Sequence, residues 1–215
     1  MTASTLGLRM QRRGVASPLV VRVVPVSERV ALQRELQYHT YVYQAGLHCP
    51  EPIVSDVVFT STIACIVMGY IEGQEAITPD KTAMVGRGLA KSHTLPFSEF
   101  ATQKSVLGLQ LASRGIVPEE IDTSLVADPW ELADRLRLED LPTGPAHGDF
   151  MPNNALITGS GAAILDFGNA GRDCLGVDVA RHCLGLSLTY FITEATLLFE
   201  SFLKGSQSCS HSTTC

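Results

Sequence analysis

The chain has 215 residues and a formal net charge of −6, and 45% of its residues are hydrophobic. This length suits one domain or two closely packed lobes, and the composition excludes a disordered protein. The negative charge argues against a nucleic-acid-binding protein, because phosphate recognition uses a basic face. No apolar run approaches the roughly 20 residues of a membrane span, so we expect no membrane binding. The basic N-terminus has no acid before Glu28, as in an organellar presequence, but "PLVVRVVPV" is typical of a strand of the fold, so we expect a cytoplasmic protein.

The first part of the chain predicts a small antiparallel sheet with one helix. The segments "LGLRMQRR" and "SPLVVRVVPV" are prone to form strands, and "GVAS" between them is typical of a hairpin turn. Ser27 is the expected N-cap of a helix through "ERVALQRELQYHTYVYQ" that ends near Gly46. Two further strands are expected near residues 53–59 and 62–68, after Pro50 and Pro52.

The second part of the chain predicts mainly helices. The composition changes at "GYIEGQEAITPD", so we place an N-terminal lobe at residues 1–72 and a C-terminal lobe at 73–204. Thr78 and Pro79 begin a helix that ends near His93, and Asp128 with Pro129 repeats the same start signal. Two more helices are expected after residue 178, and residues 205–215 are expected to form a disordered tail.

The candidate chemistry lies in "PAHGDFMPNNALITGSGAAILDFGNAG", residues 145–171. A three-residue turn at 159–161 would pair Thr158 with Ala162 and place Asn154 opposite Asp166 on one face of a hairpin. Two such oxygen ligands suit Mg²⁺, which keeps positions for phosphate and water. With Asp149 just upstream, the pattern predicts a phosphoryl-transfer centre, although turn and strand-end roles would explain each residue separately.

The motifs "HGDFMPNN", "ILDFGNAG" and "GVDVA" resemble the aminoglycoside phosphotransferase family, small-molecule kinases of the protein-kinase-like superfamily. The resemblance is most specific at residues 147–180. It implies an α+β, bilobal protein-kinase-like fold, with a small antiparallel-sheet N-lobe that carries one helix and a mainly α-helical C-lobe that carries a catalytic hairpin. Gly148, where protein kinases carry arginine, favours the small-molecule branch.

The resemblance gives the motif residues their expected roles. Asp149 would orient the acceptor hydroxyl and take its proton. Asn154 and Asp166 would bind Mg²⁺ at the ATP phosphates. Asp178 and His147 would support the catalytic loop.

The resemblance also implies a nucleotide site in the N-terminal lobe. Arg22 would hold the nucleotide phosphates, with Glu35 on the following helix as its acidic partner. An ordinary edge-strand arginine and a surface glutamate are the competing interpretations. The segment "IVMGYIEG" is similar to the strand-to-linker segment whose main chain contacts adenine, which implies that Met68, Gly69 and Tyr70 bind the nucleotide.

The two ends of the sequence depart from the family's pattern. Only Gly7 and Gly14 precede Arg22, where the family has a glycine-bearing loop over the phosphates, and few residues follow "ESFLKG" to complete an acceptor pocket. We therefore expect an incomplete N-terminal lobe and a truncated C-terminal lobe.

Three functions are compatible with this sequence. The first is an ATP- and Mg²⁺-dependent phosphotransferase that acts on a hydroxyl of a small molecule, with an aminoglycoside-like cation as one acceptor. The alternative is a kinase-like regulatory protein that binds nucleotide without turnover. A protein kinase ranks last, because of Gly148 and because no "APE" segment follows Gly168. The sequence predicts neither the acceptor's identity nor the oligomeric state.

Overall fold

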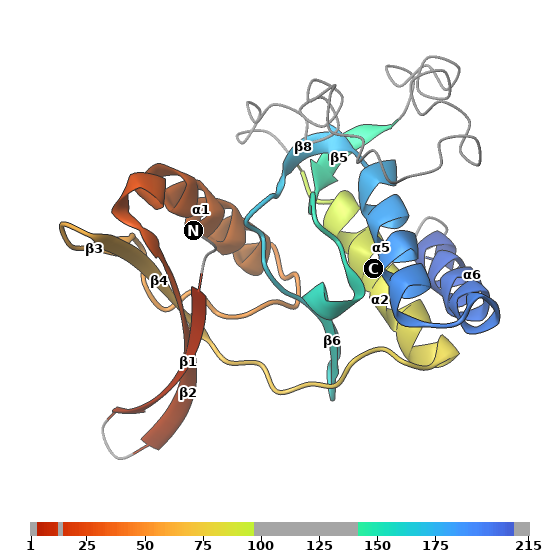
Figure 1. The fold of residues 1–215 in the computed structure, drawn as a ribbon, viewed down its shortest axis with the longest axis horizontal. Helices are drawn as coiled ribbons and strands as arrows, with labels where there is room; N and C mark the ends of the chain where they lie inside the picture. The colour runs from red at the N-terminus through yellow and green to blue at the C-terminus, as the bar shows by residue number, and fades with distance from the viewer. Residues whose placement is uncertain (1–3, 13–14, 97–141, 209–215) are drawn as a thin grey trace, which may run out of the picture.

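The computed structural model describes residues 4–12, 15–96 and 142–208, and the statements below concern these residues (Figure 1). The N-terminal elements, coloured red to orange-yellow at the left of Figure 1, form one lobe, and helices of the later chain form a second lobe beside it. This confirms the α+β, two-lobed architecture that the sequence predicted, with a small sheet in one lobe and mainly helices in the other.

The N-terminal lobe is a four-stranded antiparallel sheet with one helix. Its elements are β1 (Ser4–Arg12), β2 (Val15–Pro25), α1 (Arg29–Gln44), β3 (Val58–Phe59) and β4 (Ile63–Gly69), and the strand order is β1-β2-β4-β3. The core between sheet and helix contains Leu32 and Leu36 of α1, packed with Ala64 and Ile66 of β4. Burial of these apolar side chains fixes the helix on one face of the sheet.

Two local expectations for this lobe were wrong. Ser27 does not cap α1, because a 3-10 turn at Val26–Glu28 precedes the helix and Glu28 occupies its N-cap position without a side-chain bond. The strand expected at 53–59 is reduced to β3, because the Asp56 carboxylate accepts the Val57 amide at 2.8 Å and forms a local turn.

Helix α1 connects the two lobes. Its first half packs on the sheet, whereas Tyr38 and Val42 in its second half belong to the largest buried cluster, together with Phe150 and Phe167 of the C-terminal lobe. The rings of Tyr38 and Phe167 lie 5.7 Å apart. The segment around Phe167 is therefore held against α1 by apolar burial.

Three helices form the described body of the C-terminal lobe: α2 (Pro79–His93), α5 (Gly176–Thr189) and α6 (Ile192–Ser208). The predicted start of α2 at Thr78-Pro79 is correct, with Pro79 in its first turn. Helices α2 and α6 are in close contact, because a Cβ atom at Gly86 would collide with the carbonyl oxygen of Phe202. Glycine permits this approach of two backbones.

Short strands complete this lobe. The β6–β7 hairpin consists of Ala155–Thr158 and Gly161–Ile164, and β5 (Thr143–Ala146) pairs with β8 (Gly171–Cys174), a pair that the sequence did not predict. Helix α6 continues to Ser208, four residues past the predicted boundary of the lobe. The helix expected after Asp128 and residues 209–215 lie outside the described residues. None of the described helices is long and apolar enough to span a bilayer.

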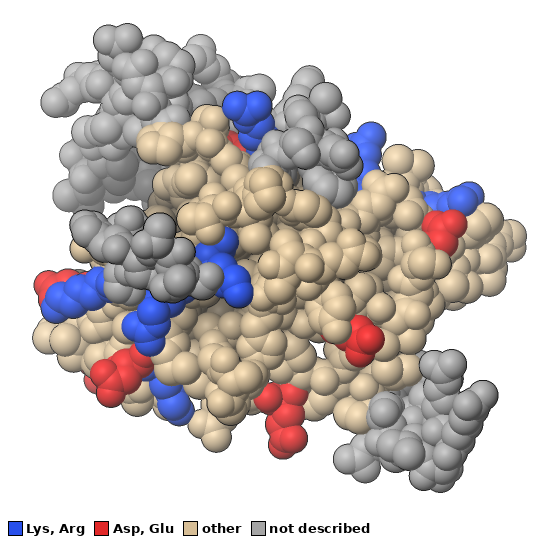
Figure 2. Space-filling view, turned by 180° about the vertical axis from the view of Figure 1, so that it is seen from behind, with Lys and Arg blue, Asp and Glu red and all other residues tan. Residues whose placement is uncertain are grey.

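Figure 2 shows the face opposite to that of Figure 1. Uncharged residues cover most of its described surface, and basic and acidic side chains both occur on it.

The candidate chemistry lies at the junction of the lobes, where β2, α1 and the β6–β7 hairpin contribute to one cavity.

Candidate active site

Asp178 of α5 fixes the loop that begins with "HGD" by hydrogen bonds to its main chain. The Asp178 carboxylate accepts the main-chain amides of His147 at 2.7 Å and Gly148 at 2.8 Å. It also contacts His93 Nε2, at the end of α2, at 2.9 Å. Asp178 is fully buried, so these three partners replace the water that a carboxylate otherwise binds. The geometry is that of a brace for the loop.

The main chain of this loop requires glycine at position 148. Gly148 has φ of +78°, and a Cβ atom there would collide with the carbonyl oxygen of Asn169. Next to it, the buried ring of His147 bonds the carbonyl oxygen of Leu165 at 2.7 Å and packs against Phe167. Burial lowers the pKa of His147, which favours the neutral ring. His147 therefore ties the loop to the strand that leads to Asp166.

Asp149 follows in the same loop, with its side chain partly exposed. Its Oδ1 accepts a hydrogen bond from Arg181 Nη1 of α5 at 3.0 Å. Its main-chain carbonyl oxygen accepts the Asn154 side-chain amide at 2.7 Å. Asn154 therefore links the position of Asp149 to the hairpin.

The hairpin has a different register from the one that the sequence predicted. Thr158 pairs with Gly161, not with Ala162, because the Thr158 hydroxyl bonds the Ser160 amide at 3.1 Å and the Gly161 carbonyl at 3.0 Å and closes a two-residue turn. Asn154 consequently lies beside Leu165, whose amide donates to the Asn154 carbonyl at 2.9 Å. The expected opposition of Asn154 and Asp166 was wrong.

Local backbone conformation nevertheless brings Asn154 and Asp166 to the same cavity. Asn154 ends a 3-10 turn at Pro152–Asn154, and Asp166 adopts the left-handed conformation with φ of +57°. Burial of the next residue, Phe167, beneath α1 holds that conformation. The two turns redirect side chains that an unbroken hairpin would place on opposite faces.

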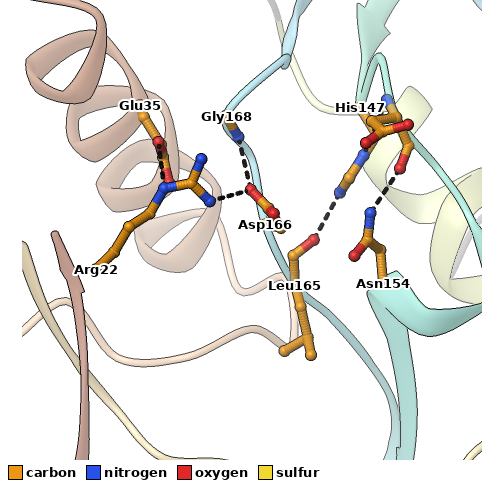
Figure 3. A network of polar contacts seen from close by, with 8 residues as sticks. Arg22, Glu35, His147, Asn154, Leu165, Asp166 and Gly168 are labelled. Atoms are coloured by element: carbon orange, nitrogen blue, oxygen red, sulfur yellow. Dashed lines mark hydrogen bonds and ion pairs between the residues drawn. The ribbon is translucent and has the colours of Figure 1, made fainter. Parts of the chain in front are cut away.

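Arg22 of β2 lies between two carboxylates (Figure 3). Its Nη1 is 2.5 Å from Asp166 Oδ1, and its Nε is 3.3 Å from Glu35 Oε2 on α1. The Gly168 amide donates to the same Asp166 oxygen at 3.3 Å. The sequence placed Arg22 and Glu35 as partners, and the structure brings them together with Asp166.

Glu35 is buried, and its surroundings disfavour its charge. Burial raises the pKa of Glu35 from 4.5 to about 7, while the neighbouring Arg22 lowers it and Asp166 raises it. The ion pair thus only partly offsets the loss of hydration. A glutamate on a solvated surface, the competing interpretation, does not fit this environment.

A cavity of about 300 Å³ joins these groups. Seven of the predicted site residues line it: Arg22, Glu35, Met68, Gly69, Tyr70, Asn154 and Asp166. His39, for which the sequence gave no functional signal, lines it as well and bonds the Pro50 carbonyl at 2.7 Å. Asp149 and His147 lie outside the cavity lining, on the loop next to it, and Asp178 lies outside it on α5.

The predicted adenine segment already uses two of its main-chain amides. The amide of Gly69 donates to Glu51 at 2.8 Å, and that of Tyr70 donates to Pro18 at 3.1 Å. The next residue, Ile71, also lines the cavity, and its amide makes no hydrogen bond within the described residues. The Ile71 amide is therefore available to donate to a ligand, whereas the amides of Gly69 and Tyr70 are already bound.

The donor set of the cavity fits a hard cation. Asn154 and Asp166 both offer oxygen, and because the Asn154 nitrogen is bound to Asp149, its carboxamide oxygen is the atom that remains, on the side of Asp166 (Figure 3). Two oxygen ligands with open space beside them are typical of Mg²⁺ sites that also take phosphate and water.

Sequence reasoning missed Arg181, the partner of Asp149. A signal was present, because Arg181 follows Asp178 by three residues in "DVARHC" and residues at this spacing share a face of a helix. Because Asp178 contacts the loop, Arg181, one helical turn later, was expected to lie near the loop as well.

The curated relatives of this chain include kinases of a small amino acid. It is 27% identical over 190 residues to the homoserine kinase of Rhodopseudomonas palustris (strain TIE-1), an alignment that covers 79% of this chain and 58% of that protein. The homoserine kinase of Brucella canis is similar at the same identity, over 188 residues and 56% of its length. The chain thus spans less than two thirds of these relatives.

Solved structures show the same fold. An aminoglycoside phosphotransferase from Streptomyces rimosus matches with a TM-score of 0.68 at 18% identity, covering 93% of this chain and 85% of that one. A choline/ethanolamine kinase family protein from Mesorhizobium loti matches with a TM-score of 0.57 at 18% identity, covering 93% of this chain and 70% of that one. The family model described as "Phosphotransferase enzyme family" matches residues 7–206, which confirms the resemblance, and the chain belongs to that family.

Proposed function

We propose that this protein is an ATP- and Mg²⁺-dependent phosphotransferase that transfers the γ-phosphate to a hydroxyl group of a small molecule. The observation that carries the proposal is the convergence of Arg22, Asn154 and Asp166 on one cavity, with Asp149 tied to Asn154 at its edge. Phosphate anchor, metal ligands and acceptor-side carboxylate then lie in the order that a phosphoryl transfer needs.

The cavity supports the nucleotide part of the proposal. Val20 of β2 on one side and Leu156 and Leu165 on the other provide apolar walls for a flat base. The Ile71 amide is the donor that we assign to the adenine ring. On nucleotide binding, the Arg22 guanidinium would leave Asp166 and contact the nucleotide phosphates, while its ion pair with Glu35 would keep it in place.

In the transfer step, the acceptor oxygen forms a bond to the γ-phosphorus as the bond from this phosphorus to the β–γ bridging oxygen breaks. The bridging oxygen leaves with the electron pair as part of ADP. Asp149 accepts the hydroxyl proton late in the step and releases it to water, because the transition state is loose. Asn154 and Asp166 would hold the Mg²⁺ ion, which neutralises charge on the phosphates when bound.

What the relatives share supports a proposal for the acceptor class. Proteins similar to this chain are named as kinases of homoserine, ethanolamine and choline and as phosphotransferases of aminoglycosides, and these acceptors all carry both a hydroxyl group and a nitrogen function. We propose a small amino alcohol or hydroxy amino acid as acceptor and the cytoplasm as the location of the reaction.

Ligand-induced thermal stabilisation tests the nucleotide site first. The wild type should gain several degrees in melting temperature with Mg²⁺ and ATP together, and Asp166→Ala should lose this gain. Asp80→Ala, which removes an exposed aspartate at the start of α2, should retain it. Absence of any Mg²⁺-dependent stabilisation in the wild type would refute the proposal.

Radiolabelled transfer from γ-labelled ATP tests turnover. Homoserine, ethanolamine, choline and streptomycin form the acceptor panel, and Asp149→Ala should lower the rate on any accepted compound at least about 100-fold. Nucleotide binding without transfer to any acceptor would favour the alternative function, a kinase-like protein without turnover.

A further inference from the structure

Helix α5 contacts three consecutive residues of the catalytic loop through two side chains one turn apart. Asp178 accepts the main-chain amides of His147 and Gly148, and Arg181 donates to the carboxylate of Asp149 at 3.0 Å. The two groups differ in what they fix. Asp178 holds the main chain of the loop, whereas Arg181 holds the side chain that would meet the acceptor.

Within the described residues, Arg181 is the hydrogen-bond partner of the Asp149 carboxylate. The Asn154 side chain donates to the main-chain oxygen of Asp149 and makes no bond to the Asp149 carboxylate. The partners of Asp178 fix the backbone but not the side-chain dihedral angles of Asp149. The Arg181 and Asp149 side chains are 26% and 35% exposed, so the carboxylate would otherwise turn freely towards solvent.

We propose that Arg181 is a positioning residue for phosphoryl transfer: it holds Oδ1 of Asp149 so that Oδ2 faces the acceptor hydroxyl. This inference rests on the proposed function. Orientation matters more than basicity here, because in a loose transition state the carboxylate aligns the nucleophile and takes its proton late.

The guanidinium has a second effect, on charge. The Asp149 carboxylate must approach a polyanionic nucleotide, and a neighbouring cation reduces the repulsion between them. A different role for Arg181, direct contact with the transferred phosphoryl group, would give a similar loss of rate in a single variant. The two roles differ in whether the effect of Arg181 depends on Asp149.

Three arginine variants test the proposal with the acceptor that the wild type uses. Arg181→Met should lower kcat by about 10- to 100-fold and leave the KM for ATP within about twofold. Arg181→Lys should recover most of kcat, because a single contact to Oδ1 can be made by an ammonium group. Arg172→Met, which removes an exposed arginine on β8, should match the wild type. An unchanged kcat for Arg181→Met would overturn the proposal.

A double-mutant cycle separates the two roles. If Arg181 acts through Asp149, Arg181→Met should cost less than about threefold when added to Asp149→Ala. A cost as large as in the wild-type background would show that Arg181 contacts the phosphoryl group itself and would overturn the positioning role. Melting temperature and ATP affinity of each variant identify any loss that comes from misfolding, and Arg181→Lys provides the test where Arg181→Met fails to fold.

A readout without turnover keeps this inference distinct from the proposed function. If the wild type transfers phosphate to no acceptor, the proposed function fails, but crystal structures of the wild type and Arg181→Met still test the contact. The Asp149 carboxylate should keep its direction in the wild type and lose it in the variant. The same carboxylate orientation in both would overturn the positioning role.

Discussion

Glu35→Gln should stabilise the protein at high pH while it weakens nucleotide binding. Glu35 is 7% exposed, and burial raises its pKa to about 7 although Arg22 lies 3.3 Å away. The folded protein therefore prefers the neutral carboxyl group. Glutamine has nearly the same shape and stays neutral at every pH, so the substitution removes the cost of burying the charge and keeps the packing.

The magnitude follows from the difference between the folded and unfolded pKa values. Glu35 ionises near 4.5 in the unfolded chain and near 7 in the folded protein, so the folded state binds more protons between these values. The free energy of unfolding of the wild type then falls as the pH rises through this window. At about 1.4 kcal/mol per pKa unit, the contribution of Glu35 reaches up to about 3 kcal/mol by pH 8.

Urea denaturation at pH 5, 6, 7 and 8, without nucleotide, measures this effect. The difference in unfolding free energy between Glu35→Gln and the wild type should shift in favour of the variant by about 2–3 kcal/mol from pH 5 to pH 8. The pKa of about 7 already includes the attraction of Arg22, so the loss of that ion pair in the variant needs no separate correction. Glu200→Gln, a change at an exposed glutamate on α6, should give a flat difference.

The same variant connects this charge to function. Without Glu35, Arg22 keeps only Asp166 as a partner, so we expect the affinity for Mg–ATP to fall about 10-fold. A stability difference that is equal at pH 5 and pH 8 to within about 0.5 kcal/mol, or that shifts in favour of the wild type, would refute the reasoning about Glu35.

Three further variants test the packing around the site. Gly86→Ala should lower the free energy of unfolding by about 2–4 kcal/mol, because its methyl group meets the backbone of α6. Gly88→Ala on the same helix should be neutral or stabilising by up to about 1 kcal/mol, and equal urea midpoints of the two variants would contradict the α2–α6 contact. His182→Phe should make stability less sensitive to acid, because burial lowers the pKa of His182 to about 4. The free energy of unfolding of the wild type then falls by up to about 3 kcal/mol as the pH falls from 6.5 towards 4, and an equal loss in wild type and variant between melts at pH 7 and pH 4.5 would speak against this. Asp178→Asn should lower the free energy of unfolding by about 2–4 kcal/mol, because an NH₂ group replaces one of the two buried acceptor oxygens, and a change below about 0.5 kcal/mol in urea melts would argue against the brace.

Sequence analysis could name most of the proposed site residues because they lie in short, specific motifs. Asp149 and Asn154 stand five residues apart on one loop, and Asp166 follows a glycine-containing turn, so local chain geometry is enough to place them near each other. Arg22 and Glu35 were found only through the resemblance, because 144 residues separate Arg22 from Asp166 and no local pattern connects them.

The hairpin register shows where local reasoning fails. Gly159-Ser160-Gly161 permits both a two-residue and a three-residue turn, and one hydroxyl group, that of Thr158, selects the shorter one. Such a choice depends on the two hydrogen bonds of one side chain, each with a net contribution of about 1 kcal/mol. Sequence patterns do not resolve an energy of this size.

The sequence by itself determined most of the helices and the motif residues, because hydrophobic periodicity, proline and glycine signals and short motifs are local properties of a chain. The fold class came from the family resemblance that those motifs carry. The tertiary structure decided which charges meet. Arg22 reaches Asp166 and Glu35, and Arg181 reaches Asp149, only after α1 and α5 pack beside the loop. Burial of helix faces sets those positions, and burial is a property of the whole folded chain.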